Sequence, residues 1–403
     1  MQVADHVDPA LIRDFDYHGG AEFLVDPFQA LDRARGDRAF FSVAYGGYWV
    51  LTRFADIREA FQRPDLFSSV QFSIPAGAYP RTMRPLALDP PDHTRYRKPL
   101  APLFAPGPIA RREPEVRRVC AGLVDRFATA GRSDLVVDLA RPFPTTVFVS
   151  MLGLPLSEAS TFEQWNHDLT HAYHDPELRK SAARSIIGYL DEVATARMKE
   201  DPADREDLLS ALVRSEVDGR PLDHEELVDY AFMLFVAGLD TVTAMLGFTF
   251  YCLATRPDIR EQLVARPELV RGAVEEFLRT HAIINTARLV TEDTTFAGVP
   301  MRAGDRVLLS TALASRDPEE LDQPDAIVVD REVNRHLAFG AGPHRCVGSH
   351  LARLELAIAI DEVLRRIPEF HLAADEEPVI HAGGSFGIDR LVLEWDADAK
   401  QEM

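Results

Sequence analysis

The sequence predicts a mainly α-helical protein with small antiparallel β-sheets. Apolar residues recur at helical spacing over most of the chain, and strand-like alternation is confined to two short stretches that contain glycines. A long helical stretch, residues 223–256, could cross a whole domain at about 1.5 Å per residue. The 403 residues are 46 % hydrophobic and 27 % charged, which is enough apolar material for a sizeable core.

The two strand-like stretches are residues 40–52, which turn at Gly46 and Gly47, and residues 295–309, which contain Gly298 and Gly304. Apolar and polar side chains alternate on both sides of these glycines, as in short antiparallel hairpins. Elsewhere helical spacing dominates. The predicted apolar helix faces are Val116, Val119, Leu123 and Phe127 in one helix, and Ile186, Leu190 and Val193 in another.

Residues 68–91 are predicted to form a long irregular loop, because prolines and Gly77 interrupt any regular pattern there. Long loops of this kind in compact domains are often active-site lids. A merely solvated connector is the alternative, but the loop carries apolar side chains that suit it poorly. These side chains are Phe72, Ile74, Tyr79 and Met83.

The long helix is expected to start at Asp223, where Glu226 completes a capping box, and to end before Pro257. Its apolar part contains one charged residue, Asp240, so a membrane span has to be considered. We reject a span because polar and small residues lie in its middle and no basic flank precedes it. A buried central helix with a functional polar notch explains the pattern better. The polar and small residues in the middle of the stretch are Gly238, Asp240, Thr241 and Thr243, and the notch itself is the run 237–242.

The net charge of -20 argues against nucleic acid and anionic membranes as partners. Residues 1–35 form an acidic N-terminal lead-in without an apolar run, so neither a signal peptide nor a membrane anchor is predicted. The three cysteines, Cys120, Cys252 and Cys346, are too few and too far apart for a disulfide framework or a CxxC metal pair. We therefore expect a cytoplasmic protein.

The third cysteine lies in the run FGAGPHRCVG, residues 339–348, just before a helical pattern. Its glycines allow a tight turn against a flat object, and the start of a helix favours the thiolate form of Cys346. One alternative is a buried cysteine that acts as a small hydrophobe. Another is a nucleophile activated by His344, although no group that would orient this histidine is evident.

This ten-residue run, with its expected strand–loop–helix context, resembles the haem-ligand loop of the cytochrome P-450 family. The resemblance implies that Cys346 is the axial ligand of the iron of haem b. It also implies one triangular, mainly α domain over residues 1–403. The haem would lie between the central helix and the helix within residues 335–367.

The notch resembles the family's oxygen-activation motif, so Asp240 and Thr241 are the implied catalytic residues. The valine that follows, Val242, is similar to that of camphor hydroxylases. Taken alone, a threonine on a buried helix usually just bonds to the preceding turn. The pair Glu276 and Arg279 resembles the family's ExxR motif, with Arg331 as third member and a structural role.

Further cofactor contacts are implied by the order of residues along the chain. Basic side chains at four of these positions would bond to the haem propionates, as charge-assisted bonds to carboxylates favour. They are His93, Arg97, Arg288 and His344, and the remaining implied cofactor contacts are Ala237, Phe339 and Gly348.

The positions that match the family's substrate-facing segments are mostly apolar, which favours a compact hydrophobic substrate such as a terpenoid or a small aromatic. Where camphor hydroxylases carry a substrate-binding tyrosine, this chain has Arg81, which argues against camphor itself. Either Tyr79 points inward instead, which we favour, or Arg81 or Arg84 pairs with a substrate carboxylate. The candidates are Phe72, Ile74, Tyr79, Arg81, Met83, Met233, Val236, Ala237, Ile284, Thr286 and Phe386.

The implied activity is that of a monooxygenase that uses dioxygen and receives electrons from a ferredoxin and a ferredoxin reductase. A peroxide-driven or ring-coupling haem-thiolate enzyme is the alternative. A haem sensor is disfavoured, because gas binding needs no proton relay. A basic patch on the cysteine side is expected to receive the ferredoxin, formed by Arg97, Arg112, Arg345 and Arg353.

Overall fold

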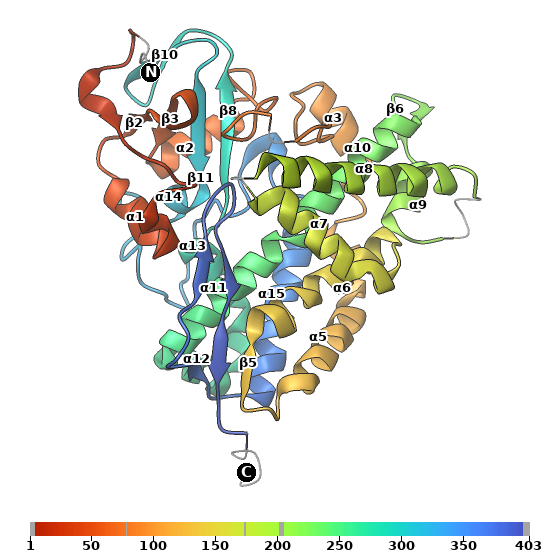
Figure 1. Ribbon diagram of the computed structural model, residues 1–403. Helices are drawn as coiled ribbons and strands as arrows, with labels where there is room; N and C mark the ends of the chain where they lie inside the picture. The colour runs from red at the N-terminus through yellow and green to blue at the C-terminus, as the bar shows by residue number, and fades with distance from the viewer. Residues whose placement is uncertain (1–4, 78, 173–174, 201–204, 398–403) are drawn as a thin grey trace.

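The computed structural model describes residues 5–77, 79–172, 175–200 and 205–397. Figure 1 shows a roughly triangular outline with the main sheet toward the N-terminal corner and most helices on the opposite side. The described part of the chain ends toward the lower apex (Figure 1). This mainly helical architecture with minor sheets is the fold class that the sequence predicts.

The largest sheet has six strands in the order β1-β2-β3-β11-β8-β4. Its strands are β1 (Ile12–Arg13), β2 (Ala39–Ser42), β3 (Tyr48–Leu51), β4 (Phe67–Ser68), β8 (Asn285–Val290) and β11 (Arg306–Ser310). The predicted hairpin at residues 40–52 is confirmed, since β2 and β3 pair antiparallel around Gly46 and Gly47.

The second predicted hairpin is correct only around Gly298, where β9 (Thr294–Phe296) pairs with β10 (Val299–Met301). The segment after Gly304 is β11, which leaves this hairpin and pairs antiparallel with β8 and parallel with β3. The sheet is therefore mixed rather than purely antiparallel. Local alternation identifies a strand but cannot tell which distant strand will be its neighbour.

Smaller sheets lie toward the C-terminal half. A three-stranded sheet contains β12 (His371–Leu372), β15 (Val392–Glu394) and β5 (Arg132–Asp134). In the hairpin of β13 (Val379–His381) and β14 (Gly387–Arg390), β14 packs against the helix α11 (Thr241–Thr255). A last hairpin joins β6 (Glu216–Val217) to β7 (Arg220–Pro221).

The helices supply most of the core. The predicted face of α5 (Glu113–Phe127) is buried at Val116, Leu123 and Phe127, and that of α8 (Pro176–Arg197) is buried at Ile186 and Leu190. The others are α1 (Pro27–Ala34), α2 (Phe54–Gln62), α3 (Asp92–Arg97), α4 (Pro106–Arg111), α6 (Pro142–Leu152), α7 (Ala159–His171), α9 (Leu208–Val213), α12 (Pro257–Ala265), α13 (Val270–Thr280), α14 (Thr311–Ser315) and α15 (Ser349–Arg366).

The central helix begins as predicted, because the Asp223 carboxylate accepts from the Glu226 N–H at 2.9 Å and Glu226 accepts from the Asp223 N–H at 3.0 Å. The prediction of one continuous helix is wrong. The stretch is divided into α10 (His224–Leu239) and α11 (Thr241–Thr255), with Asp240 between them at φ −115° and ψ −38°. Glycine and aspartate are weak helix formers, so the polar notch is also where helical geometry is lost.

The stretch His224–Thr255 is long and apolar enough to cross a membrane, with a mean hydropathy of 1.8 in its most apolar window. However, 78 % of that window is buried inside the protein, as in the core helix of a folded domain. Helix α10 packs against α6, α7 and α8, and helix α11 packs against α15 and β14. The central pair thus links the two ends of the molecule.

Residues 69–77 and 79–91 contain neither helix nor strand, in agreement with the predicted loop. The loop is nevertheless anchored, since Ile74 and Met83 are buried and the Phe72 carbonyl accepts from the Thr286 hydroxyl at 2.9 Å. It lies beside α10 through ion pairs described below. A loop that is irregular yet buried at two points suits a lid better than a solvated connector.

Candidate functional site

Cys346 lies between a tight turn, Gly342–His344, and the start of α15. The Cys346 N–H donates to the Phe339 carbonyl at 2.9 Å, which closes the loop. Gly342 has φ +66°, and a Cβ there would lie 2.3 Å from the Phe61 carbonyl oxygen, so only glycine allows this close approach. The expected strand before the loop is wrong, because residues 332–341 form none.

The sulfur of Cys346 lies in an electrically mixed environment. Burial of the sulfur raises its pKa, whereas the Gly348 N–H and the guanidinium groups of Arg97, Arg345 and Arg353 lower it. The other two cysteines differ, since burial raises the pKa of Cys252 to about 12 and that of Cys120 further still. Only Cys346 presents an exposed residue surface, so it is the cysteine suited to a ligand.

A group of basic side chains lies beside the loop of Cys346 and forms no ion pair with any described residue. The rings of His93 and His344 lie 4.0 Å apart between centroids. Arg288 is 4 % exposed, and burial lowers its pKa to about 10. Among the described residues, neither Arg288 nor Arg97 has an ion pair; Arg288 donates to the Ala287 carbonyl at 2.7 Å and Arg97 donates to the Arg345 carbonyl.

Two of these groups have unsatisfied ring atoms. Both ring nitrogens of His93 and Nε2 of His344 are buried without a hydrogen bond to any described residue. Burial and the neighbouring arginines lower the pKa of His93 to about 4, and burial together with Arg288 lowers that of His344 to about 2. Buried donors and excess positive charge of this kind suit an anionic ligand.

The notch residues Asp240 and Thr241 stand at the junction of α10 and α11. The Thr241 hydroxyl donates to the Ala237 carbonyl at 3.3 Å, which is the bond to the preceding turn that a threonine on a helix usually makes. Asp240 lies 3.1 Å from Nε2 of His171 and accepts from the Ser385 hydroxyl at 3.3 Å. The helix that follows the notch, α11, packs against α15, the helix that follows Cys346 (Figure 1).

The charge of Asp240 depends on groups that the sequence reasoning missed. Burial raises the pKa of this carboxyl, but His171, His381 and Ser385 outweigh burial and hold the pKa well below its usual value. Asp240 is therefore ionised at neutral pH. The spacing of His167 and His171, four residues apart on one helix face, is a signal that could have pointed to His171, whereas no local pattern points to His381 or Ser385.

The predicted structural triad is assembled around one buried carboxylate. Glu276 and Arg279 are both fully buried, and Arg279 donates to the two Glu276 oxygens at 2.8 and 2.9 Å. Arg331 donates to Glu276 at 3.0 Å, as does Asn334 at 2.8 Å. Burial raises the pKa of Glu276, but these donors and the Val328 N–H keep it below its usual value.

The substrate candidates within residues 68–91 partly come together. Phe72 and Tyr79 stack with centroids 5.5 Å apart, and with Arg81 they line a pocket of about 320 Å³. The arginines are engaged by α10: Arg81 donates to Asp229 at 2.6 Å and Arg84 pairs with the same carboxylate. A second acid, Glu225, lies 2.6 Å from Arg81.

The remaining candidates are dispersed. Phe386 is fully buried and packs against Phe23 and Phe28 in the core, with centroids 6.1 and 6.0 Å away. Ile284 forms an isolated bridge with Ser385, opposite the notch. Met233 and Val236 are buried on α10.

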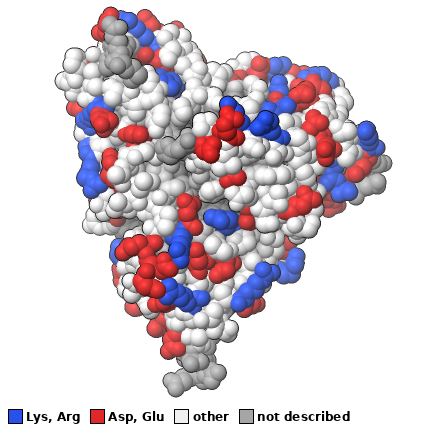
Figure 2. Space-filling model, in the orientation of Figure 1, with Lys and Arg blue, Asp and Glu red and all other residues white. Residues whose placement is uncertain are grey.

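The expected basic patch is partly neutralised. Arg353 forms an ion pair with Glu275 at 2.5 Å and Arg112 pairs with Glu115 at 3.5 Å. On the face in Figure 2, acidic and basic side chains are interspersed rather than segregated.

The family described as Cytochrome P450 matches residues 47–380. The chain is 37 % identical over 406 residues to a probable cytochrome P450 127A1 of Sinorhizobium fredii, covering 98 % of this chain and 97 % of that protein. It is 35 % identical to a vitamin D(3) 25-hydroxylase of Pseudonocardia autotrophica, over 86 % and 87 % of the two chains. The crystal structure of CYP101J2 superposes with a TM-score of 0.89 at 30 % identity, over 98 % of this chain and all of that one.

Replacing Glu276 by alanine should leave Arg279 buried without its counter-ion. We expect the free energy of unfolding to fall by about 3–5 kcal/mol, as for other broken buried pairs. Thermal unfolding followed by circular dichroism measures this loss. Because the pKa of Glu276 is lowered on folding, its contribution is present above the unfolded-state pKa and is lost as pH falls.

The control is Glu261→Ala on α12, which replaces an exposed glutamate and should change stability by less than about 0.5 kcal/mol. An equal loss in the two variants would contradict the role of the Glu276 network.

Proposed function

This chain belongs to the cytochrome P450 family, and from that premise we propose that it inserts one atom of dioxygen into a compact, mostly apolar substrate. Members of the family are oxygenases that bind haem b through an axial cysteine thiolate. The observation that carries the proposal for this chain is the loop around Cys346 with the basic groups beside it. The residues fit such a cofactor in both donor type and charge.

Cys346 would hold the iron, since it is the one exposed cysteine and follows a turn that only glycine permits. Arg97, Arg288, His93 and His344 would bind the propionates, and the orphaned ring nitrogens would then gain partners. The bound haem supplies the oxygen-activating redox chemistry, which a thiolate ligand favours. The protein supplies the ligand, the orientation of the group and a dry environment.

Asp240 and Thr241 would deliver protons at the notch. Asp240 is ionised, and its bonds to His171 and Ser385 keep its pKa low, so it would take up and pass on a proton once it is released from these partners. Within the described residues, the Thr241 hydroxyl has a single hydrogen bond, to the Ala237 carbonyl, and can turn toward the reacting oxygen. An intact acid–alcohol pair favours a monooxygenase over a haem sensor, which needs no proton supply.

For the substrate we propose a neutral, compact hydrophobic molecule that enters beneath the lid loop. Phe72 and Tyr79 offer an apolar stack at the pocket there. Arg81 and Arg84 already form ion pairs with Asp229 and Glu225 of α10. We therefore infer that these arginines attach the loop to α10 and do not bind a substrate carboxylate.

We further propose a cytoplasmic location and electron supply from a ferredoxin and its reductase, approaching on the cysteine side. Arg97 and Arg345 would remain the basic groups there, because Arg112 and Arg353 are ion-paired. A peroxide-driven or ring-coupling reaction is the second candidate, because an intact notch does not exclude coupling.

The reduced, carbon-monoxide-bound protein should show the strongly red-shifted Soret band of thiolate ligation. In Cys346→His this band should be abolished, because imidazole replaces the thiolate. Absorption spectroscopy of the haem-loaded proteins measures it, and Cys252→Ala, which removes a buried cysteine, should keep the band. A Cys346→His protein that retained the wild-type spectrum would remove Cys346 as the ligand.

Replacing Thr241 by alanine should uncouple turnover. Reductant and oxygen should still be consumed, but hydrogen peroxide should be released in place of product, because the hydroxyl that steers the proton is gone. Asp240→Asn should instead slow turnover. The ratio of product to reductant consumed is the measurement.

Thr243→Ala is the matched control, since Thr243 makes the same bond to the preceding turn, to the Leu239 carbonyl at 3.4 Å. It should stay coupled. Full coupling in Thr241→Ala would exclude Thr241 from the mechanism.

Neutral terpenoids should bind more tightly than carboxylic acids of the same skeleton, because no unpaired cation faces them from Arg81 or Arg84. Titration followed by the spin-state shift of the haem gives both affinities. Tighter binding of the acids, lost in Arg81→Ala or Arg84→Ala, would show that an arginine reads a substrate carboxylate.

A further inference from the structure

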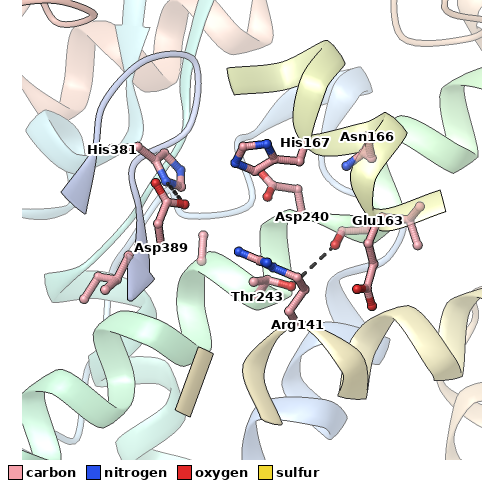
Figure 3. Close-up of a pocket in the computed structure, with 11 residues that line it drawn as sticks. Arg141, Glu163, Asn166, His167, Asp240, Thr243, His381 and Asp389 are labelled. Carbon is pink, nitrogen blue, oxygen red and sulfur yellow. Dashed lines mark hydrogen bonds and ion pairs between the residues drawn. The ribbon is translucent and has the colours of Figure 1, made fainter. Parts of the chain in front are cut away.

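Three histidines and two aspartates lie close together beside the notch, and all of them except His171 line a small cavity. They come from α7, the α10–α11 junction and the β13–β14 hairpin, which are remote in sequence. In Figure 3, His381 and Asp389 face His167 and Asp240 across this cavity. The five residues are His167, His171, Asp240, His381 and Asp389.

Three of these side chains converge closely. Their ligand atoms, one each from His171, Asp240 and His381, all lie within 4.8 Å of one another. Nε2 of His171 is 3.1 Å from an Asp240 oxygen, and the rings of His171 and His381 are 4.0 Å apart at 89°. Ligands around a tetrahedral zinc ion are roughly 3.3 Å apart, so side-chain rotations would close the site.

His381 is held as metal-binding histidines are held. Its Nδ1 lies 2.9 Å from an Asp389 oxygen, while its Nε2 is buried without a hydrogen bond to any described residue. A carboxylate on one ring nitrogen fixes the orientation of the other toward a metal. The ring also fills the space that a side chain at Gly387 would need, since a Cβ there would lie 2.5 Å from Nε2.

The cavity has the size of an ion. Its volume is about 20 Å³, which is room for one water molecule or one ion. His381, Asp240 and His167 line it, and the side chain of His167 is 45 % exposed, so solvent reaches the site past this residue. Arg141 also lines the cavity, but the carboxylates of Asp240 and Asp389 outnumber its charge.

We propose that His171, Asp240 and His381 bind one zinc ion, with His167 or a water molecule as the fourth ligand. Two imidazoles and a carboxylate are a zinc donor set, whereas calcium and magnesium prefer oxygen ligands alone. An ion pair between His171 and Asp240 would explain those two residues by themselves. That ion pair would not explain why Nε2 of His381 is buried without a hydrogen bond to any described residue, or why Asp389 orients this ring.

The site has a consequence for catalysis, which rests on the proposed function. Zinc ligation would occupy the Asp240 carboxylate and hold it away from proton transfer. We therefore expect zinc to inhibit coupled turnover of the wild-type enzyme, and to inhibit His381→Ala less.

The test is calorimetric titration of zinc chloride into the haem-loaded, untagged protein. We expect one site on the wild type and at least tenfold weaker binding in both His171→Ala and His381→Ala. His371→Ala replaces an exposed histidine of β12 and should bind zinc as the wild type does. Each variant must keep its haem spectrum, which shows that it is folded.

Equal zinc affinity in the wild type and in His381→Ala, or no binding to the wild type, would overturn the proposal. X-ray absorption at the zinc edge provides a second measurement. It should show at least two imidazole nitrogens and one carboxylate oxygen at about 2.0–2.1 Å, and a shell without imidazole would contradict the site. Calorimetry does not depend on oxygen chemistry, so its failure leaves the carbon monoxide spectrum as a separate test of the proposed function.

Discussion

The buried carboxylate of Glu276 is the interaction on which the site depends. It accepts from Arg279 on its own helix and from Arg331, Asn334 and the Val328 N–H on the segment that leads to the cysteine loop. Arg279 in turn donates to the carbonyls of that segment, at 2.6 Å for Pro324. This irregular segment is thus fixed to α13 although it contains no strand or helix. The reason is that a buried charge is costly unless ion pairs and hydrogen bonds compensate it, so the donors of the segment must stay in place around Glu276.

Charge is divided by the central helix pair. On the cysteine side, Arg288 and Arg97 lie near the buried His93 and the half-buried His344 and form no ion pair with any described residue, and burial together with the arginines lowers the pKa of both histidines. At the notch, Asp240 pairs with His171 and Asp389 pairs with His381. The first arrangement is suited to an anion and the second to a cation, and the helix break at Asp240 is where the second approaches the reaction site.

Local patterns were reliable where the interaction that produces the structure is itself local. The capping box of Asp223 and Glu226, the buried face of α5 and the hairpin of β2 and β3 each involve residues close in sequence, and each was predicted. The division of the central helix was missed, although Gly238 and Asp240 are weak helix formers. A Cβ on Gly238 would lie 2.2 Å from Phe148 of α6, and no local pattern contains that contact.

The sequence by itself determined the fold class, the cysteine suited to the iron, and the residues of the notch and of the Glu276 network. These residues lie in contiguous motifs, or they occur along the chain in the order that the family resemblance implies. Only the tertiary structure decided which groups surround them. His171 and His381 reach Asp240 from elements 69 and 141 positions away, and β11 joins β3 rather than the hairpin beside it. Burial and charge at a site are sums over neighbours that folding brings together, so a linear pattern names the reacting side chain but not the partners that set its protonation.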